Sequence, residues 1–222
     1  MHSFKTLHKK ECYTFNYLSK LKKHNTCMRY LLITLISLQA CLLVAQNKED
    51  INLLDTDTTW RKETLFFPFP FARDIDLEGQ IDVRFSKGWS DQESPLFWSY
   101  AFGWDITRKE KFTEAEIEEI MVKYLGGLMK VVNRDKDFIV PETIALFTEV
   151  PNNKDMISYR GKIRMHDSFF SKKIVVLNVI GKYHFCKQDG RAKLLFKLSP
   201  QDLDHEAWEY LNQAKFQADV CK

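Results

Sequence analysis

The sequence is poor in the residues that break regular structure. Its 222 residues include 8 Gly and 6 Pro, and it contains no low-complexity stretch and no internal repeat. These absences exclude a largely disordered chain, a solenoid and a propeller. Also missing are the motifs GxGxxG, the Walker loop, HExxH, GxSxG and a paired Cys-x-x-Cys. We therefore expect no cofactor, no metal site and no catalytic residue, with a hydrolase-like enzyme of unrecognised site as an alternative.

The part of the chain after residue 45 also lacks an excess of basic residues. The chain carries 33 Lys and Arg against 30 Asp and Glu, a net charge of +3, but residues 1–45 hold seven of the basic residues and one of the acidic ones. The remainder therefore holds 26 basic and 29 acidic residues. A mildly acidic body lacks the positive field that nucleic acids attract, so we expect no nucleic-acid partner.

Residues 28–45 have the pattern of a secretory signal peptide. Arg29 supplies a positive charge, an apolar run follows over residues 31–44, and Ala45 is a small residue suited to cleavage. The run is shorter than the roughly 20 apolar residues that span a bilayer. We predict an exported protein, periplasmic or extracellular, with a retained N-terminal anchor as the alternative. Residues 1–27 are then a non-native or disordered extension, residues 46–58 a linker, and residues 59–222 one domain.

The segment Leu38-Gln39-Ala40-Cys41 resembles a bacterial lipobox. The resemblance implies that Cys41 becomes the lipidated first residue of the mature protein and tethers it to a membrane. Gln39 departs from the pattern, because small or apolar residues are usual at its position. Lipidation at Cys41 and plain cleavage near Ala45 are therefore two alternatives.

A central aromatic strand is expected at residues 96–106, LFWSYAFGWDI. Successive strand residues point to opposite faces, so one face is entirely bulky and the other, after Phe97, entirely small. The bulky face predicts a core. The small face, with Ala101 and Gly103, needs a closely packed neighbour, and the pair Gly126-Gly127 is the candidate.

The order of patterns predicts an α+β fold. Strands are expected at residues 60–67, 80–85, 96–106, 143–150, 157–166, 173–186 and 192–198, and Asp189-Gly190 is a hairpin signal between the last two. A capping box begins one helix at Thr113, and Ser199-Pro200 is expected to begin another that ends at about residue 217. We predict a mainly antiparallel sheet of about six to seven strands covered by two long helices.

Loop aromatics are the first candidate site. Phe67, Phe69, Phe71 and Trp89 are expected to line a hydrophobic groove for a small apolar ligand. The alternative is that they close the open end of the core.

A basic stripe is the second candidate site. Arg160, Lys162, Arg164 and His166 alternate along one expected strand and are a candidate surface for an anionic partner, such as a lipid head group, a glycan or an acidic protein. The alternative is the solvated face of a strand, where basic residues also deter edge pairing.

Cys186 and Cys221 are the only cysteines after residue 45. In an oxidising compartment an even pair is a candidate disulfide, and two free thiols are the other alternative, because the sequence does not specify the distance between them. His184 lies on the same strand face as Cys186, but no second ligand pair stands at a recognisable spacing.

These observations favour a non-enzymatic cell-envelope domain that binds another envelope protein or a small apolar ligand. The enzyme alternative would place His184, His166 or an acidic residue in a cleft. A third possibility is a structural or assembly factor whose only membrane attachment is its N-terminal anchor.

Overall fold

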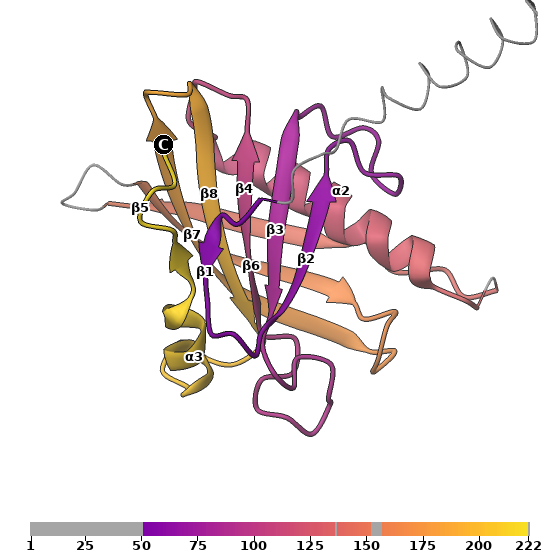
Figure 1. The fold of residues 1–222 in the computed structure, drawn as a ribbon. Helices are drawn as coiled ribbons and strands as arrows, with labels where there is room; N and C mark the ends of the chain where they lie inside the picture. The colour runs from indigo at the N-terminus through magenta and orange to yellow at the C-terminus, as the bar shows by residue number, and fades with distance from the viewer. Residues whose placement is uncertain (1–50, 136, 152–156, 222) are drawn as a thin grey trace, which may run out of the picture. The chain divides into compact units, whose positions relative to one another are not determined.

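A computed structural model describes residues 51–135, 137–151 and 157–221 (Figure 1). The predicted extension at residues 1–27, the predicted signal peptide at residues 28–45 and Cys41 lie outside the described residues. No helix in the described part of the chain is long and apolar enough to cross a membrane.

The fold is α+β and is built on a seven-stranded antiparallel sheet, as the alternating patterns predict. The strands lie in the order β2 (Arg61–Phe66), β3 (Gly79–Phe85), β4 (Tyr100–Ile106), β8 (Arg191–Ser199), β7 (Ile174–Cys186), β6 (Ile157–His166) and β5 (Ile144–Val150). A second sheet pairs β1 (Leu54–Asp55) with β9 (Lys215–Phe216), and the helices within the described ranges are α2 (Glu114–Val132) and α3 (Ala207–Gln213). The hairpin between β7 and β8 turns at Gly190, whose φ of +67° suits glycine.

The inner face of the sheet carries the main core, beneath α2. Phe102 and Trp104 of β4 are fully buried there with Met121 of α2. The capping box is confirmed, because the hydroxyl of Thr113 accepts the N–H of Glu116 at 3.3 Å and the Thr113 N–H donates to the Glu116 carboxylate at 2.8 Å. The helix therefore begins where its sequence predicts.

The outer face of β4 is covered at Gly103 by Leu53 and Leu54 rather than by α2. A Cβ added to Gly103 would lie 2.7 Å from the Leu53 side chain and 3.0 Å from that of Leu54. The predicted contact with the pair Gly126-Gly127 is wrong, because α2 lies on the opposite face and a Cβ at Gly127 would meet the carbonyl oxygen of Phe71. Part of the stretch expected to be a linker thus belongs to the folded body.

The expected strand at residues 96–106 is shorter than its pattern. It begins at Tyr100, because Trp98 adopts a φ of 54° and its N–H donates to the Trp89 carbonyl at 2.8 Å. Residues 96–99 therefore close a loop that returns Trp89 to the sheet, instead of extending β4.

The prediction of two long helices covering the sheet is not supported. α2 has 19 residues, but α3 has only 7. Ser199 remains in β8, where its hydroxyl lies 2.7 Å from that of Ser99 and accepts the N–H of Gln201 at 3.2 Å. The chain then bends, and the Trp208 indole donates to the Gln201 carbonyl at 3.1 Å. Because of these contacts, α3 begins at Ala207 and not directly after Ser199.

Candidate functional site

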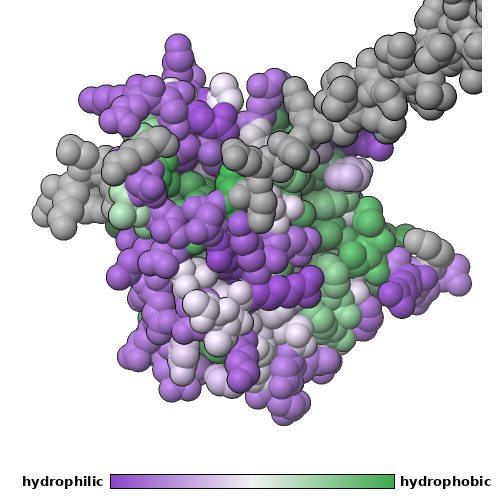
Figure 2. Space-filling view, in the orientation of Figure 1, coloured by the Kyte–Doolittle hydropathy of each residue, from purple (hydrophilic) through white to green (hydrophobic). Residues whose placement is uncertain are grey.

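An aromatic cavity opens between the inner face of the sheet, α2 and two loops. In Figure 2 hydrophobic residues gather on the side of the molecule where β2 and α2 lie. The cavity, here called the aromatic pocket, has a volume of about 510 Å³. This lies within the range of roughly 300–1,000 Å³ typical of small-molecule sites. It is lined by Arg61, Glu63, Leu65, Phe71, Val83, Phe85, Trp89, Ser90, Trp98, Tyr100, Tyr124, Leu125, Leu128, Phe169 and Phe170.

Ring-to-ring packing holds the wall of the aromatic pocket in place. The ring centroid of Trp89 lies 4.2 Å from that of Phe85 and 5.2 Å from that of Phe170. Phe85 packs in turn on Tyr100 at 5.7 Å. These aromatic pairs join β3, the loop that holds Trp89 and the loop after β6. Each pair contributes about 0.5–1.5 kcal/mol beyond burial.

Two phenol groups give the aromatic pocket a polar element. Tyr100 and Tyr124 both line it, and neither hydroxyl makes a hydrogen bond within the described residues. Burial raises the pKa of Tyr100, with a further contribution from Tyr124, and burial together with the charge of Glu63 raises the pKa of Tyr124. Both phenols therefore stay protonated at neutral pH and are free to donate to a ligand.

The predicted loop aromatics divide between the pocket and the core. Phe71 and Trp89 both line the aromatic pocket. Phe67 and Phe69 are buried instead, Phe67 edge-on to Trp104 at 6.0 Å and Phe69 stacked on Phe71 at 5.2 Å. Phe67 and Phe69 therefore belong to the core and not to the pocket wall.

Most residues of the pocket wall carry no signal in the sequence that marks them as lining a cavity. Tyr100 lies on the bulky face that predicts a core, and no sequence motif marks Tyr124 as part of a site. Phe169 and Phe170 lie in the loop after β6, and their adjacent bulky rings are the one signal that the sequence offers for them. Pattern alone does not distinguish a buried ring from a ring that faces an internal cavity.

Only three of the four residues of the predicted basic stripe are exposed. Arg160, Lys162 and Arg164 are exposed along the outer side of β6. His166 is buried at the end of the strand, with its ring nitrogens held by Ser168 and by the carbonyl of Lys172.

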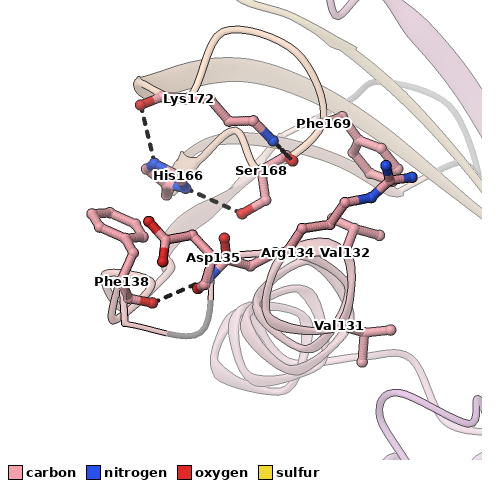
Figure 3. A pocket seen from close by; sticks show the side chains of 10 residues that line it. Val131, Val132, Arg134, Asp135, Phe138, His166, Ser168, Phe169 and Lys172 are labelled. Carbon is pink, nitrogen blue, oxygen red and sulfur yellow. Dashed lines mark hydrogen bonds between the residues drawn. The ribbon is translucent and has the colours of Figure 1, made fainter.

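His166 and Ser168 line a second cavity of about 1000 Å³ near the end of α2 (Figure 3). The Nδ1 of His166 lies 3.1 Å from the Ser168 hydroxyl, and its Nε2 lies 3.1 Å from the Lys172 carbonyl. A carbonyl only accepts, so in the neutral ring Nε2 carries the proton and Nδ1 accepts from Ser168. A serine beside a base that is oriented by a third group is the arrangement of a nucleophile.

The loop after β6 does not supply the rest of an acyl-transfer site. The Asp167 carboxylate accepts the backbone N–H groups of Phe169, Phe170 and Ser171 at 2.7–3.0 Å. Burial acts to raise the pKa of Asp167, but the hydrogen bonds from Ser171 and Phe170 outweigh it and lower that pKa. Donors that would stabilise an oxyanion beside Ser168 are thus occupied. We assign the histidine–serine pair to holding this loop against the sheet.

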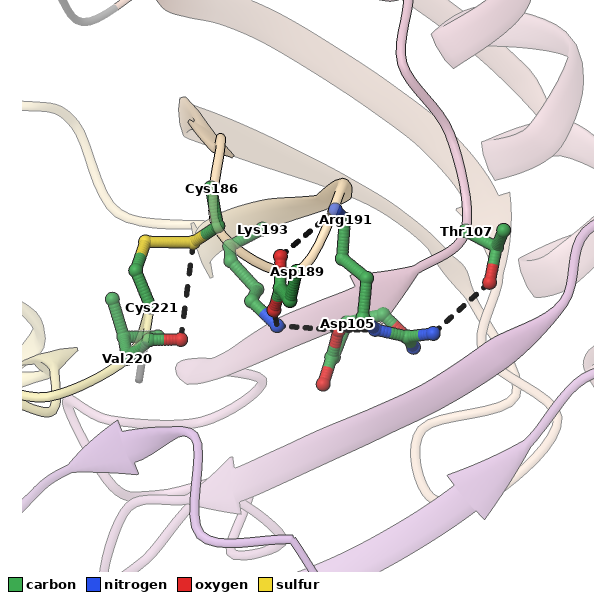
Figure 4. Close-up of polar contacts among 8 residues, drawn as sticks. All are labelled: Asp105, Thr107, Cys186, Asp189, Arg191, Lys193, Val220 and Cys221. Atoms are coloured by element: carbon green, nitrogen blue, oxygen red, sulfur yellow. Dashed lines mark hydrogen bonds and ion pairs between the residues drawn. A yellow bond between two sulfur atoms is a disulfide. The ribbon is translucent and has the colours of Figure 1, made fainter.

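Cys186 and Cys221 form a disulfide, which is one of the two alternatives that the sequence leaves open (Figure 4). Their Cα atoms lie 5.2 Å apart, and the bond ties the C-terminal end of the described chain to β7. The ligand atoms of His184 and the two cysteines lie within 4.8 Å of one another. While the sulfurs are bonded to each other they are not thiolates, so this group offers a metal ion one imidazole.

A cluster of ion pairs lies beside the disulfide (Figure 4). Lys193 is almost fully buried, and its ammonium lies 2.7 Å from the Asp105 carboxylate and 3.0 Å from that of Asp189. Arg191 adds a contact of 2.5 Å to Asp105. The cluster fastens the β7–β8 hairpin to β4 and uses each of its charges internally.

Comparison of the chain with protein-family models, with curated proteins and with solved structures found no match.

Proposed function

We propose that this protein is a non-enzymatic binding protein that takes a small apolar ligand into the aromatic pocket. The observation that carries the proposal is a cavity of about 510 Å³ with an aromatic wall and two tyrosine hydroxyls that have no hydrogen-bond partner among the described residues. A pocket of this kind, mostly apolar with few polar groups, selects ligands by shape and by one or two hydrogen bonds.

The wall indicates the chemistry of the ligand. Rings such as Trp89, Phe85 and Phe170 favour a planar or alicyclic body. The hydroxyls of Tyr100 and Tyr124 favour a hydroxyl, carbonyl or ether oxygen on that body. Arg61 and Glu63, both exposed, add a charge of each sign to the lining and so favour a ligand without net charge.

We further propose that the protein acts outside the cytoplasm, in the periplasm or beyond. The signal-peptide pattern at residues 28–45 supports this proposal, and a disulfide between Cys186 and Cys221 is in keeping with an oxidising compartment. N-terminal sequencing of the mature protein tests it, and an intact Met1 in the cytoplasm would contradict it. Metabolic labelling with a palmitate analogue, compared with Cys41→Ser, separates a lipid anchor from plain cleavage.

Binding is tested with N-phenyl-1-naphthylamine, an uncharged apolar fluorophore. We expect saturable binding of one probe per chain. Leu65→Trp and Leu128→Trp, which fill the aromatic pocket from β2 and from α2, are expected to weaken it at least tenfold. Leu203→Trp is the matched control, because Leu203 is exposed and does not line the pocket.

The polar element is tested by displacing the probe with 1-naphthol or with naphthalene. The double variant Tyr100→Phe with Tyr124→Phe is expected to weaken 1-naphthol by about tenfold, the worth of one hydrogen bond, and to leave naphthalene unchanged. An equal loss of affinity for 1-naphthol and for naphthalene would contradict the proposal. So would probe binding that is unchanged in both Leu65→Trp and Leu128→Trp.

A further inference from the structure

The outer side of β5, β6 and β7 is an exposed sheet face that the aromatic pocket does not use. Its side chains point away from α2, since alternate residues of a strand face opposite sides. We call this surface the outer basic face and define it by Ile144 and Leu146 of β5, Arg160, Lys162 and Arg164 of β6, and Val176 of β7.

The charge of the outer basic face is of one sign. Within the described residues, Arg160, Lys162 and Arg164 form no ion pair with an acidic group. None of the described β5, β6 and β7 residues that share this face is acidic. The three cations lie two residues apart along one strand, so their charges point in one direction from a flat surface. This arrangement attracts an extended anionic surface.

Aliphatic side chains flank the cations. Ile144 and Val176 lie on either side of Arg164 in the strand register and are 52% and 44% exposed. Leu146, which is 65% exposed, lies opposite Lys162. Aliphatic side chains that are exposed to water gain no burial energy. At the boundary between lipid head groups and acyl chains, the aliphatic side chains contact the acyl chains while the neighbouring cations contact the phosphates.

We propose that the outer basic face docks the protein onto an anionic lipid bilayer. The cations contact lipid phosphates, and Leu146, Ile144 and Val176 enter the head-group boundary. Single-stranded nucleic acid is a poorer match, because base stacking needs aromatic side chains and the exposed large hydrophobic residues of this face are aliphatic. Docking by this face leaves the aromatic pocket, on the inner side of the sheet, open to a ligand.

The proposal is tested by co-sedimentation of the full chain with vesicles of phosphatidylcholine alone or with 30% phosphatidylglycerol. We expect binding to the anionic vesicles that falls steeply when NaCl is raised from 0.1 M to 0.5 M. The triple variant Arg160→Gln, Lys162→Gln, Arg164→Gln should weaken it by on the order of 100-fold. Its control, Lys87→Gln, Lys109→Gln, Lys130→Gln, removes the same charge from exposed positions elsewhere and should change binding by less than about threefold.

Residues 1–50 are identical in every variant, so a difference in lipid binding between the two triple variants is due to the substituted residues. A second variant, Leu146→Ser with Ile144→Ser, keeps the charge and should weaken binding about tenfold. Equal binding to both kinds of vesicle, or equal loss in the two triple variants, would overturn the proposal. So would binding to an acidic protein such as polyglutamate with no binding to the anionic vesicles. Thermal unfolding of each variant confirms that these exposed substitutions leave the fold intact.

Discussion

Asp82 and Arg84 form a buried bidentate ion pair on the outer face of β3. The Nε of Arg84 lies 2.6 Å from Oδ1 of Asp82, and its Nη2 lies 2.9 Å from Oδ2. The same carboxylate accepts the backbone N–H groups of Leu53 and Leu54, both at 3.0 Å. One charged pair therefore fastens the segment that leads into the domain and, through the two leucines, covers Gly103.

Asp82→Asn is expected to destabilise the protein by about 3–5 kcal/mol, because it leaves the buried guanidinium of Arg84 without its counter-charge. Urea denaturation at pH 7 measures the loss. The control is a double-mutant cycle with Arg84→Met, in which the double variant should cost clearly less than the sum of the two single variants. Costs that add to within about 0.5 kcal/mol would show that the two side chains are not coupled.

The adjacent glycines of α2 should respond in opposite directions to alanine. A Cβ at Gly127 would lie 2.2 Å from the backbone oxygen of Phe71, whereas a Cβ at Gly126 meets the Thr143 side chain, with the hydroxyl at 3.3 Å and the Cβ at 3.5 Å. Gly127→Ala should lower the unfolding free energy by about 1–3 kcal/mol through overpacking. Gly126→Ala should be neutral or stabilise by up to about 1 kcal/mol, because alanine is the better helix former. Thermal unfolding of the pair decides, and similar effects at both positions would contradict this packing.

Removing the disulfide should destabilise the folded state. Cys186 and Cys221 are 35 residues apart, a loop for which chain entropy predicts a loss of about 3–4 kcal/mol in the variant Cys186→Ser with Cys221→Ser. Dithiothreitol should lower the stability of the wild type by a similar amount and leave the serine variant unchanged. If the reductant has no effect on the wild type, the bond does not contribute to its stability.

The stability should depend on the titration of Lys197. Burial, together with the charges of Lys182 and Lys215, lowers the pKa of this ammonium from 10.5 to about 8. Between those two pH values the unfolded state binds more protons than the folded state, so the unfolding free energy gains up to about 1.4 kcal/mol for each unit of rising pH. The cost of the buried charge is fully present below pH 8.

Lys197→Met removes this titration and keeps much of the side-chain volume. Relative to the wild type, the variant should be most stabilised at pH 7 and should lose much of that advantage as the pH rises to 9.5. The variant also loses the hydrogen bond from Lys197 to Asn212, which lowers its unfolding free energy by an amount that does not depend on pH. The measurement is therefore how the difference in unfolding free energy between variant and wild type changes with pH. A difference that stays level from pH 7 to 9.5 would contradict the lowered pKa.

Local patterns predicted the elements whose neighbours agree with them. The alternation at residues 157–166 and 192–198, the turn at Gly190 and the capping box at Thr113 all appear in the structure. Ser199-Pro200 also carries a helix-start signal, yet the serine stays in β8 through its bond to Ser99, 100 residues away. A local propensity of about 1 kcal/mol does not outweigh such tertiary contacts.

The candidate sites show the same division. Composition and spacing selected Phe71 and Trp89 and the three exposed cations of β6, since these signals lie within single segments. The hydroxyls of Tyr100 and Tyr124 were out of reach, because they meet at one cavity only when a strand and a helix pack together.

By itself the sequence determined the fold class, most strand positions, the long helix and the cysteine pair that became the disulfide. These depend on the period of apolar residues and on short-range hydrogen bonds, which a linear chain displays. Only the tertiary structure decided that Leu53 and Leu54, rather than Gly126-Gly127, cover the small face of β4, and that bulky rings enclose a cavity instead of filling it. The physical reason is that close packing depends on which surfaces meet across long separations in the chain, and a period along the sequence does not specify that partner.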